Sequence, residues 1–152
     1  MKRSIKLLVA FGASALVATV AAGIALAGGT SGAAHVDLAS SPLGRILVDG
    51  KGITLYDFAL DKPKTSACYG ACAALWPPLT TSGKPVAGPG VRASLLGTTK
   101  RKDGKLEVTY NGHPLYYFVT DRKPGQTTGQ GLNQFGAPWW VLSAAGKEIH
   151  HG

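Results

Sequence analysis

The chain has 152 residues with a formal net charge of +8, and it contains 21 glycines, 9 prolines and only 16% charged residues. This length allows one compact core and excludes a second large domain. Because turns between many short strands draw on glycine and proline, the composition predicts an all-β, mainly antiparallel fold and argues against a helical one.

The N-terminal segment has the pattern of an export signal. Its first six residues include three basic side chains, and residues 7–27 carry no charge and end in Ala25-Leu26-Ala27. Small residues at the first and third of these positions suit a signal peptidase, so we expect residues 1–27 to be a cleaved signal peptide. The alternative is an uncleaved anchor, because the apolar run is long enough to span a bilayer.

Export would change both the charge and the partners of the protein. Removing three basic residues lowers the net charge to +5 (13 basic, 8 acidic), and no cysteine precedes Cys68 to carry an N-terminal lipid. We therefore expect a secreted or cell-envelope protein without a lipid anchor and, after cleavage, without a stable membrane span. Nucleic acid is not an expected partner, whereas an anionic surface or another envelope component is possible through long-range attraction.

The segment after the signal is small and polar over residues 28–41, which predicts a flexible linker. His35 lies in it and is expected to be an exposed side chain rather than a metal ligand. The β-rich domain is then expected over residues 42–152. It consists of two similar repeats, at about 44–90 and 94–149, each built on a hairpin.

The first repeat begins with a predicted β-hairpin, in which residues 45–48 and 53–58 are strands and residues 49–52 are the turn. Alternation along the second strand places Tyr56 and Phe58 on one face, and Leu55 and Asp57 on the other. This pattern predicts an aromatic face that packs into the core.

Asp61 follows this strand by three residues. A carboxylate at such a position commonly accepts backbone N–H groups of the following loop, and we expect this structural role. General acid–base catalysis is the alternative, but no second carboxylate or histidine is spaced in the sequence to assist it.

The two cysteines, Cys68 and Cys72, are expected to form a disulfide in an exported protein. The short loop would contribute only about 2 kcal/mol. A regular helix holds Cβ atoms four residues apart at about 5–6 Å, but a disulfide needs about 3.5–4.5 Å. The bridge thus requires an irregular turn, for which Gly70 supplies the freedom. Alternatively, the thiols stay apart and hold a soft metal such as Cu(I), or act in redox chemistry, with His113 as a further ligand.

The second repeat copies the first without the cysteines. Residues 94–99, 106–110 and 115–119 are predicted strands, separated by turns that include Asn111-Gly112. We expect His113 to be an exposed turn residue and the cations around residue 103 to lie on a solvated hairpin tip. The corresponding residues of the two repeats are Tyr56 and Tyr116, Phe58 and Phe118, Asp61 and Asp121, and Trp76 and Trp139.

These motifs resemble the bacterial family called secreted repeat of unknown function, whose members are described as predicted lipoproteins with a Yx(F/W/Y)xxD motif. The resemblance rests on Y-x-F-x-x-D in both repeats, on S-x-C-x-G-x-C-A-x-x-W-P-P-L in the first repeat and on the PG and GQG loop of the second. It covers about residues 44–149. The family carries no established activity that could be transferred to this chain.

The sequence therefore predicts a non-enzymatic cell-envelope or extracellular domain with a binding or structural role, no cofactor and an unidentified partner. The motif aromatics are expected to build the core, with Trp76 closing one end of it. The alternative is an extracytoplasmic metal-binding or redox protein that uses Cys68 and Cys72. A hydrolase is disfavoured, because no nucleophile, base and orienting acid can be assembled from the sequence.

Overall fold

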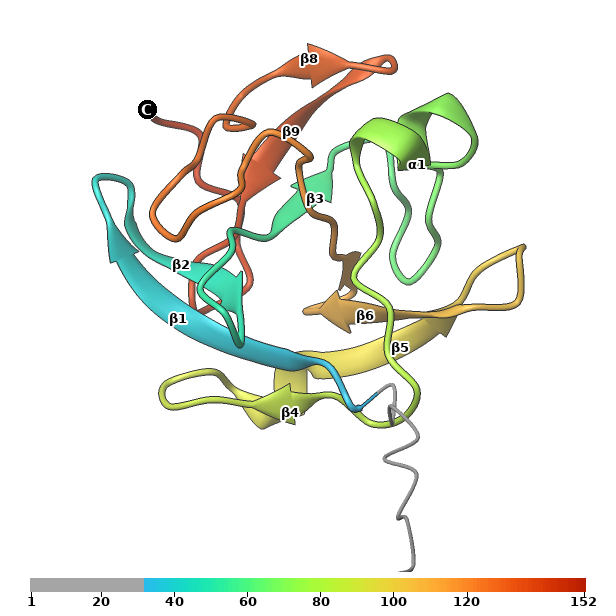
Figure 1. Ribbon diagram of the computed structural model, residues 1–152, viewed down its shortest axis with the longest axis horizontal. Helices are drawn as coiled ribbons and strands as arrows, with labels where there is room; N and C mark the ends of the chain where they lie inside the picture. Colours follow the sequence, from blue (N-terminus) through green and yellow to red (C-terminus); the bar gives the residue numbers. More distant parts are fainter. Residues whose placement is uncertain (1–31) are drawn as a thin grey trace, which may run out of the picture.

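The computed structural model describes residues 32–152, so the predicted signal peptide and the start of the predicted linker lie outside the described residues. Strands predominate in a single small domain, and the all-β prediction is confirmed (Figure 1). Within the described residues no helix is long and apolar enough to cross a bilayer. The elements are β1 (His35–Ser41), β2 (Gly44–Asp49), β3 (Tyr56–Phe58), α1 (Ala71–Leu75), β4 (Val86–Ala87), a 3-10 turn (Ala93–Leu95), β5 (Leu96–Lys100), β6 (Leu106–Tyr110), β7 (His113–Pro114), β8 (Asn133–Gln134) and β9 (Ala137–Val141).

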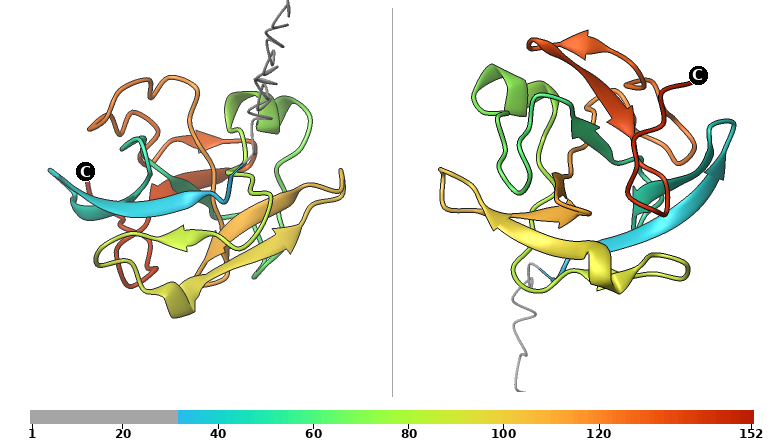
Figure 2. Two further views of the ribbon diagram at one scale, coloured as in Figure 1. Left: turned by 60° about the horizontal axis from the view of Figure 1, so that its bottom comes forward. Right: turned by 180° about the vertical axis from the view of Figure 1, so that it is seen from behind.

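The strands form three small sheets, with the orders β2-β1-β4, β3-β9-β8 and β5-β6-β7. Every pairing is antiparallel except that of β1 with β4. Figures 1 and 2 show the three sheets turned toward a shared centre, with β3 running close to it. Backbone hydrogen bonds join neighbouring sheets, as from Leu47 N–H to the Leu142 carbonyl at 3.0 Å. The joined sheets surround an interior with two hydrophobic clusters, each of which contains residues of both repeats.

The two repeats contribute jointly to this interior. Strand β3 of the first repeat pairs with β9 of the second, so that Tyr56 lies opposite Val141 and Phe58 opposite Trp139. All three β3 residues are buried. Each of the other two sheets is formed within one half of the chain, but the β3-β9-β8 sheet needs both repeats, because the pairing partner of β3 is more than 75 residues away.

The predicted linker is wrong over its second half, since residues 35–41 form strand β1. This strand pairs with β2 from Val36, opposite Asp49, to Ser41, opposite Gly44. Val36 is fully buried. The alternation of Val36 and Leu38 with polar residues is a strand pattern, but the surrounding small residues made the segment resemble a tether.

The predicted hairpins are present near their turns, but further from the turns the strands pair with other segments. In the first repeat, Asp49 N–H donates to the Ile53 carbonyl at 2.8 Å, and the chain then leaves β2 to pair with β9. In the second, residues 115–119 are not the regular strand that was predicted. Their N–H groups bond instead to three different segments, including Tyr56 at 2.9 Å and Pro77 at 2.8 Å. Residues 115–119 therefore bond to several segments and do not pair continuously with one neighbouring strand.

A fragment containing residues 32–90, which keeps β1 with its partners β2 and β4, is expected to be unfolded, because it lacks β9, the partner of β3. Amide hydrogen exchange should show no protected core in the fragment, whereas the domain of residues 32–152 should protect the amides of Tyr56 and Phe58. Slow exchange in the isolated fragment would contradict a core shared by the repeats.

Candidate functional site

The centre of the molecule is built by the duplicated Y-x-F-x-x-D motif. The Tyr56 hydroxyl donates to Asp121 Oδ2 at 2.5 Å, and the Tyr116 hydroxyl donates to Asp61 Oδ2 at 2.7 Å. The backbones of the two tyrosines also exchange N–H to carbonyl hydrogen bonds, each at 2.9 Å. Each tyrosine is therefore bonded to the aspartate of the other repeat. The contacts of the two motifs are thus reciprocal, and the two tyrosines form an antiparallel bridge.

The second oxygen of each motif aspartate binds the loop of its own repeat. Asp61 Oδ1 accepts the Ala67 N–H at 2.7 Å, and Asp121 Oδ1 accepts the Thr128 N–H at 3.0 Å and its hydroxyl at 2.6 Å. Each aspartate thus holds its own loop with one oxygen and the partner tyrosine with the other.

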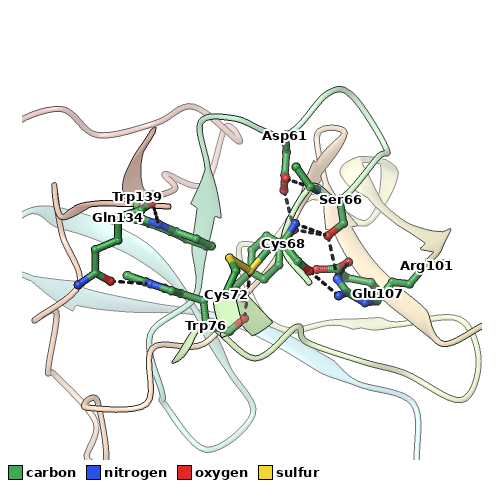
Figure 3. Close-up of a disulfide and its surroundings, with 11 residues drawn as sticks. Asp61, Ser66, Cys68, Cys72, Trp76, Arg101, Glu107, Gln134 and Trp139 are labelled. Atoms are coloured by element: carbon green, nitrogen blue, oxygen red, sulfur yellow. Dashed lines mark hydrogen bonds and ion pairs between the residues drawn. A yellow bond between two sulfur atoms is a disulfide. The ribbon is translucent and has the colours of Figure 1, made fainter. Parts of the chain in front are cut away.

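The motif phenylalanines and tryptophans form one stack that joins the two repeats. Phe58 stacks on Trp139 with ring centroids 4.1 Å apart, Trp139 on Trp76 at 4.0 Å, and Trp76 on Phe118 at 4.2 Å. The rings alternate between the first and the second repeat. Figure 3 shows both indole N–H groups directed at Gln134, one to its side-chain oxygen at 2.9 Å and one to its carbonyl at 3.2 Å.

The stack is closed at its edges by the motif tyrosines and by one close backbone approach. Tyr56 packs edge-on against Trp76 and Tyr116 against Trp139, with centroids 5.3 and 5.2 Å apart. A Cβ atom at Gly129 would lie 2.6 Å from the Trp76 ring. Only glycine lets the backbone of the GQG loop approach this ring so closely.

Removing the bond between Tyr56 and Asp121 is expected to destabilise the domain. Asp121→Ala should lower the free energy of unfolding by about 1–3 kcal/mol, because it leaves a buried hydroxyl without an acceptor and releases the loop at Thr128. Tyr56→Phe should also lower the free energy of unfolding, because the hydroxyl donates to Asp121 and accepts the Gly129 N–H at 3.2 Å. Urea denaturation measures both, with Lys123→Ala, at an exposed loop position, as control. Unchanged stability of Asp121→Ala together with loss of a binding activity would instead make Asp121 a functional residue.

The predicted disulfide between Cys68 and Cys72 is confirmed, with Cα atoms 5.2 Å apart. The geometric conflict with a helix is resolved because α1 begins only at Ala71, so that Cys68 lies outside it. Gly70, at φ +56°, forms the irregular turn between the cysteines. Both sulfurs are buried beside the aromatic stack. The bridge therefore braces the loop that carries Trp76 into the core.

A buried arginine lies beside the disulfide (Figure 3). Arg101 is only 3% exposed, and its Nη1 donates to Glu107 Oε2 at 2.7 Å and to Ser66 Oγ at 2.8 Å. Its Nη2 donates to the Cys68 carbonyl at 2.6 Å. The prediction that all the cations near residue 103 are solvated is thus wrong for Arg101. Its long side chain reaches back from the hairpin into the core, where Glu107 neutralises its charge.

This arginine belongs to a hydrogen-bonded network that ends at the motif aspartate. Ser66 Oγ lies 2.7 Å from the Tyr116 hydroxyl, which in turn donates to Asp61. Burial raises the pKa of Glu107 to about 7, against the lowering effect of Arg101, and it raises the pKa of Asp61 to about 6. Because the Ser66 hydroxyl is buried and bonded to an arginine and a tyrosine, the arrangement is that of a structural network rather than of an activated nucleophile.

A second group of titratable side chains lies at the other side of β3. His113 Nδ1 is 3.2 Å from Asp57 Oδ2, and a Glu148 carboxylate oxygen lies within 4.8 Å of both ligand atoms. Burial raises the pKa of Asp57 to about 6, and the bond to Asp57 raises the pKa of His113. Sequence reasoning did not connect these residues. The sequence feature that could have indicated this group was the aspartate in the middle of the aromatic strand LYDF.

The alternative metal site formed by Cys68, Cys72 and His113 is not assembled. Both sulfurs are joined in the disulfide, so neither is a thiolate that could hold Cu(I). The imidazole of His113 bonds Asp57 instead.

A cavity of about 480 Å³ lies between β1, the end of β2 and the segment at Tyr117. The Tyr117 hydroxyl donates to Asp49 Oδ2 at 3.0 Å along its wall. His35 and Lys51 also line the cavity, so the histidine of the supposed linker lies at a defined place on the surface. Polar and apolar residues both line this cavity, and none of them belongs to the Y-x-F-x-x-D motifs.

Comparison with known proteins identifies one family. The sequence profile described as "Secreted repeat of unknown function" matches twice, over residues 38–80 and 97–143. These two matches cover the two halves related by the motif. No curated protein and no solved structure matches the chain.

Proposed function

This chain belongs to the secreted repeat of unknown function family and is an extracellular domain; from that premise we propose that it is a non-enzymatic component of the cell envelope or the extracellular space. In this proposal the family motif stabilises the fold and does not contact a ligand. The role of the domain, in binding or in structure, is then exercised by side chains on its surface.

One observation carries the proposal: the polar atoms of the motif are used within the motif itself. Tyr56 and Tyr116 are fully buried, and their hydroxyls bond the motif aspartates. Asp121 is 5% exposed, and its two oxygens accept from a tyrosine and from a loop. A catalytic or ligand-binding motif needs groups that reach a substrate. The repeated residues instead hold two half-domains together.

The hairpin between β5 and β6 is the surface that best suits the expected anionic partner. Lys100, Lys102 and Lys105 are exposed around its turn, where Asp103 is the one acidic residue between them. With Arg101 neutralised inside, the tip still presents three cations. Such a cluster attracts phosphate and carboxylate groups on an envelope polymer or a lipid surface.

Co-sedimentation of the purified domain with phospholipid vesicles tests this surface. Binding to vesicles containing phosphatidylglycerol should weaken with added salt and should be absent from neutral vesicles. Lys102→Glu combined with Lys105→Glu should weaken binding by at least about thirty-fold, because about 1 kcal/mol is lost with each cation and each new carboxylate adds repulsion. The pair Lys123→Glu and Lys147→Glu makes the same charge change on other exposed loops and should weaken it much less.

The outcomes separate the possible partners. Competition by a soluble anionic polymer such as polyglutamate, at equal charge, would identify a polymer as the better ligand. Equal weakening by both variant pairs would show that the net charge alone acts and would contradict a role for the hairpin. Hydrolysis of a substrate by the purified domain would overturn the non-enzymatic proposal itself.

A further inference from the structure

The cluster of Asp57, His113 and Glu148 gathers three potential metal ligands from distant parts of the chain. Asp57 lies in the middle of β3, His113 begins β7, and Glu148 lies in the C-terminal segment next to Leu142. One ligand atom from each lies within 4.8 Å of the other two. The fold, rather than a local sequence motif, brings these side chains together.

Asp57 is the member of the cluster that most needs a cation. Its side chain is only 2% exposed, and its Oδ2 faces His113. Its Oδ1 is buried and has no hydrogen-bond partner in the described part of the chain. A buried carboxylate oxygen without a partner is costly, and a neighbouring carboxylate such as Glu148 adds repulsion. A bound cation would give the unpartnered oxygen a ligand bond and would offset the repulsion between the two carboxylates.

We propose that Asp57, His113 and Glu148 bind one divalent transition-metal ion of the Zn²⁺ type. An imidazole nitrogen with two carboxylate oxygens suits Zn²⁺, whereas Ca²⁺ and Mg²⁺ prefer oxygen ligands alone and Cu(I) prefers sulfur. His113 is about one-third exposed and Glu148 about one-quarter, so the ion can enter from solvent and retain a water molecule as fourth ligand. A cavity of about 90 Å³ next to His113 adjoins the site.

The ion would join three segments that are otherwise held by separate contacts. Asp57 belongs to the central strand, and Glu148 to a segment that bridges back to Leu142. Binding should therefore stabilise the folded domain and release protons, because the imidazole and both carboxylates must be unprotonated to coordinate. This inference does not depend on the proposed binding surface, and the two can fail separately.

The C-terminal histidines need a control of their own. His150 Nε2 lies 2.5 Å from Glu148 Oε2, and His151 follows directly. Two exposed histidines at a chain end can bind metal by themselves. The experiment is therefore done on protein without an affinity tag, in the wild type and in a His150→Ala, His151→Ala background.

Isothermal titration of the chelator-treated domain with Zn²⁺ tests the proposal. We expect one ion per chain, in the wild type and in the background lacking the terminal histidines. His113→Ala and Glu148→Gln should each weaken binding at least tenfold, while His35→Ala, which removes another exposed histidine, should not. The unfolding midpoint should rise with Zn²⁺ in the wild type and stay constant in His113→Ala. Both ligand variants alter partly exposed side chains, and circular dichroism verifies that they fold.

Two results would overturn the site. One is the absence of Zn²⁺ binding by the wild type. The other is binding that survives His113→Ala and Glu148→Gln but disappears with the terminal histidines, which would assign the ion to the chain end. Titrations with Mn²⁺ and Ca²⁺ test the ligand preference: Ca²⁺ binding as tight as that of Zn²⁺ would contradict a transition-metal site.

Discussion

Replacing Trp139 with alanine is expected to lower the free energy of unfolding by about 3–5 kcal/mol. Trp139 is fully buried between Phe58 and Trp76, and Tyr116 packs against its edge. Its removal opens a cavity at the centre of the stack and separates the rings of the two repeats. Because small domains are stabilised by only about 5–15 kcal/mol, much of the protein should be unfolded at moderate urea concentrations.

The adjacent Trp140 supplies a matched control. It has the same side chain on the opposite face of β9, is partly exposed and contacts only the ring of His150 among the aromatic residues described. Trp140→Ala should cost less than about 2 kcal/mol, since little apolar area leaves the interior. Urea denaturation followed by circular dichroism compares the two variants. Equal losses would show that the stack does not hold the halves together.

Arg101→Met is expected to cost about 3–5 kcal/mol, because it leaves Glu107 buried without its counter-ion. The same substitution also removes the donors to Ser66 Oγ and to the Cys68 carbonyl. The neighbouring exposed cation provides the control, and Lys102→Met should change stability by less than about 0.5 kcal/mol. Thermal and urea denaturation measure both variants.

The pH dependence of the stability of Arg101→Met tests whether the buried Glu107 causes the loss. Burial already raises the pKa of Glu107 to about 7, and Arg101 opposes that rise. Without Arg101 the folded-state pKa should rise further above the unfolded value of about 4.5, so stability is present at low pH and is lost as the pH rises through the folded pKa. The defect of Arg101→Met should be smaller at about pH 5 than at about pH 8. A pH-independent defect would place its cause elsewhere.

A double variant completes this test. Arg101→Met with Glu107→Leu removes the unpaired charge, and its stability should recover toward that of the wild type. No recovery would mean that the contacts of Arg101 with Ser66 and Cys68, and not the ion pair, account for the loss.

Local sequence patterns predicted a large part of this molecule. Glycine and proline content indicated short strands, Asn111-Gly112 indicated a tight turn, and Gly70 indicated how Cys68 and Cys72 could pair. The family was identified from the duplicated motif, and the burial of its aromatic residues follows from the alternation of Tyr56 and Phe58 along a strand. These features depend on residues within a few positions of one another, for which side-chain periodicity and turn geometry are reliable guides.

Other features depended on contacts between remote segments. Strand β1 needed β2 as a partner to become distinguishable from a tether. Arg101 was placed on a solvated turn because its counter-ion could not be recognised. Tyr56 and Asp121 are 65 residues apart, and Asp57 meets Glu148 across most of the domain.

The reason for this division is physical. A residue's backbone preference is expressed locally, so the amino-acid order alone specifies strands, turns and the short disulfide loop. A buried polar group is tolerated only beside a particular partner, and which partner it meets depends on how the two repeats dock against each other. The crossed bonds between tyrosines and aspartates, the buried arginine and the Asp57 cluster all arise at that docking, where the three-dimensional fold supplies what no local pattern contains.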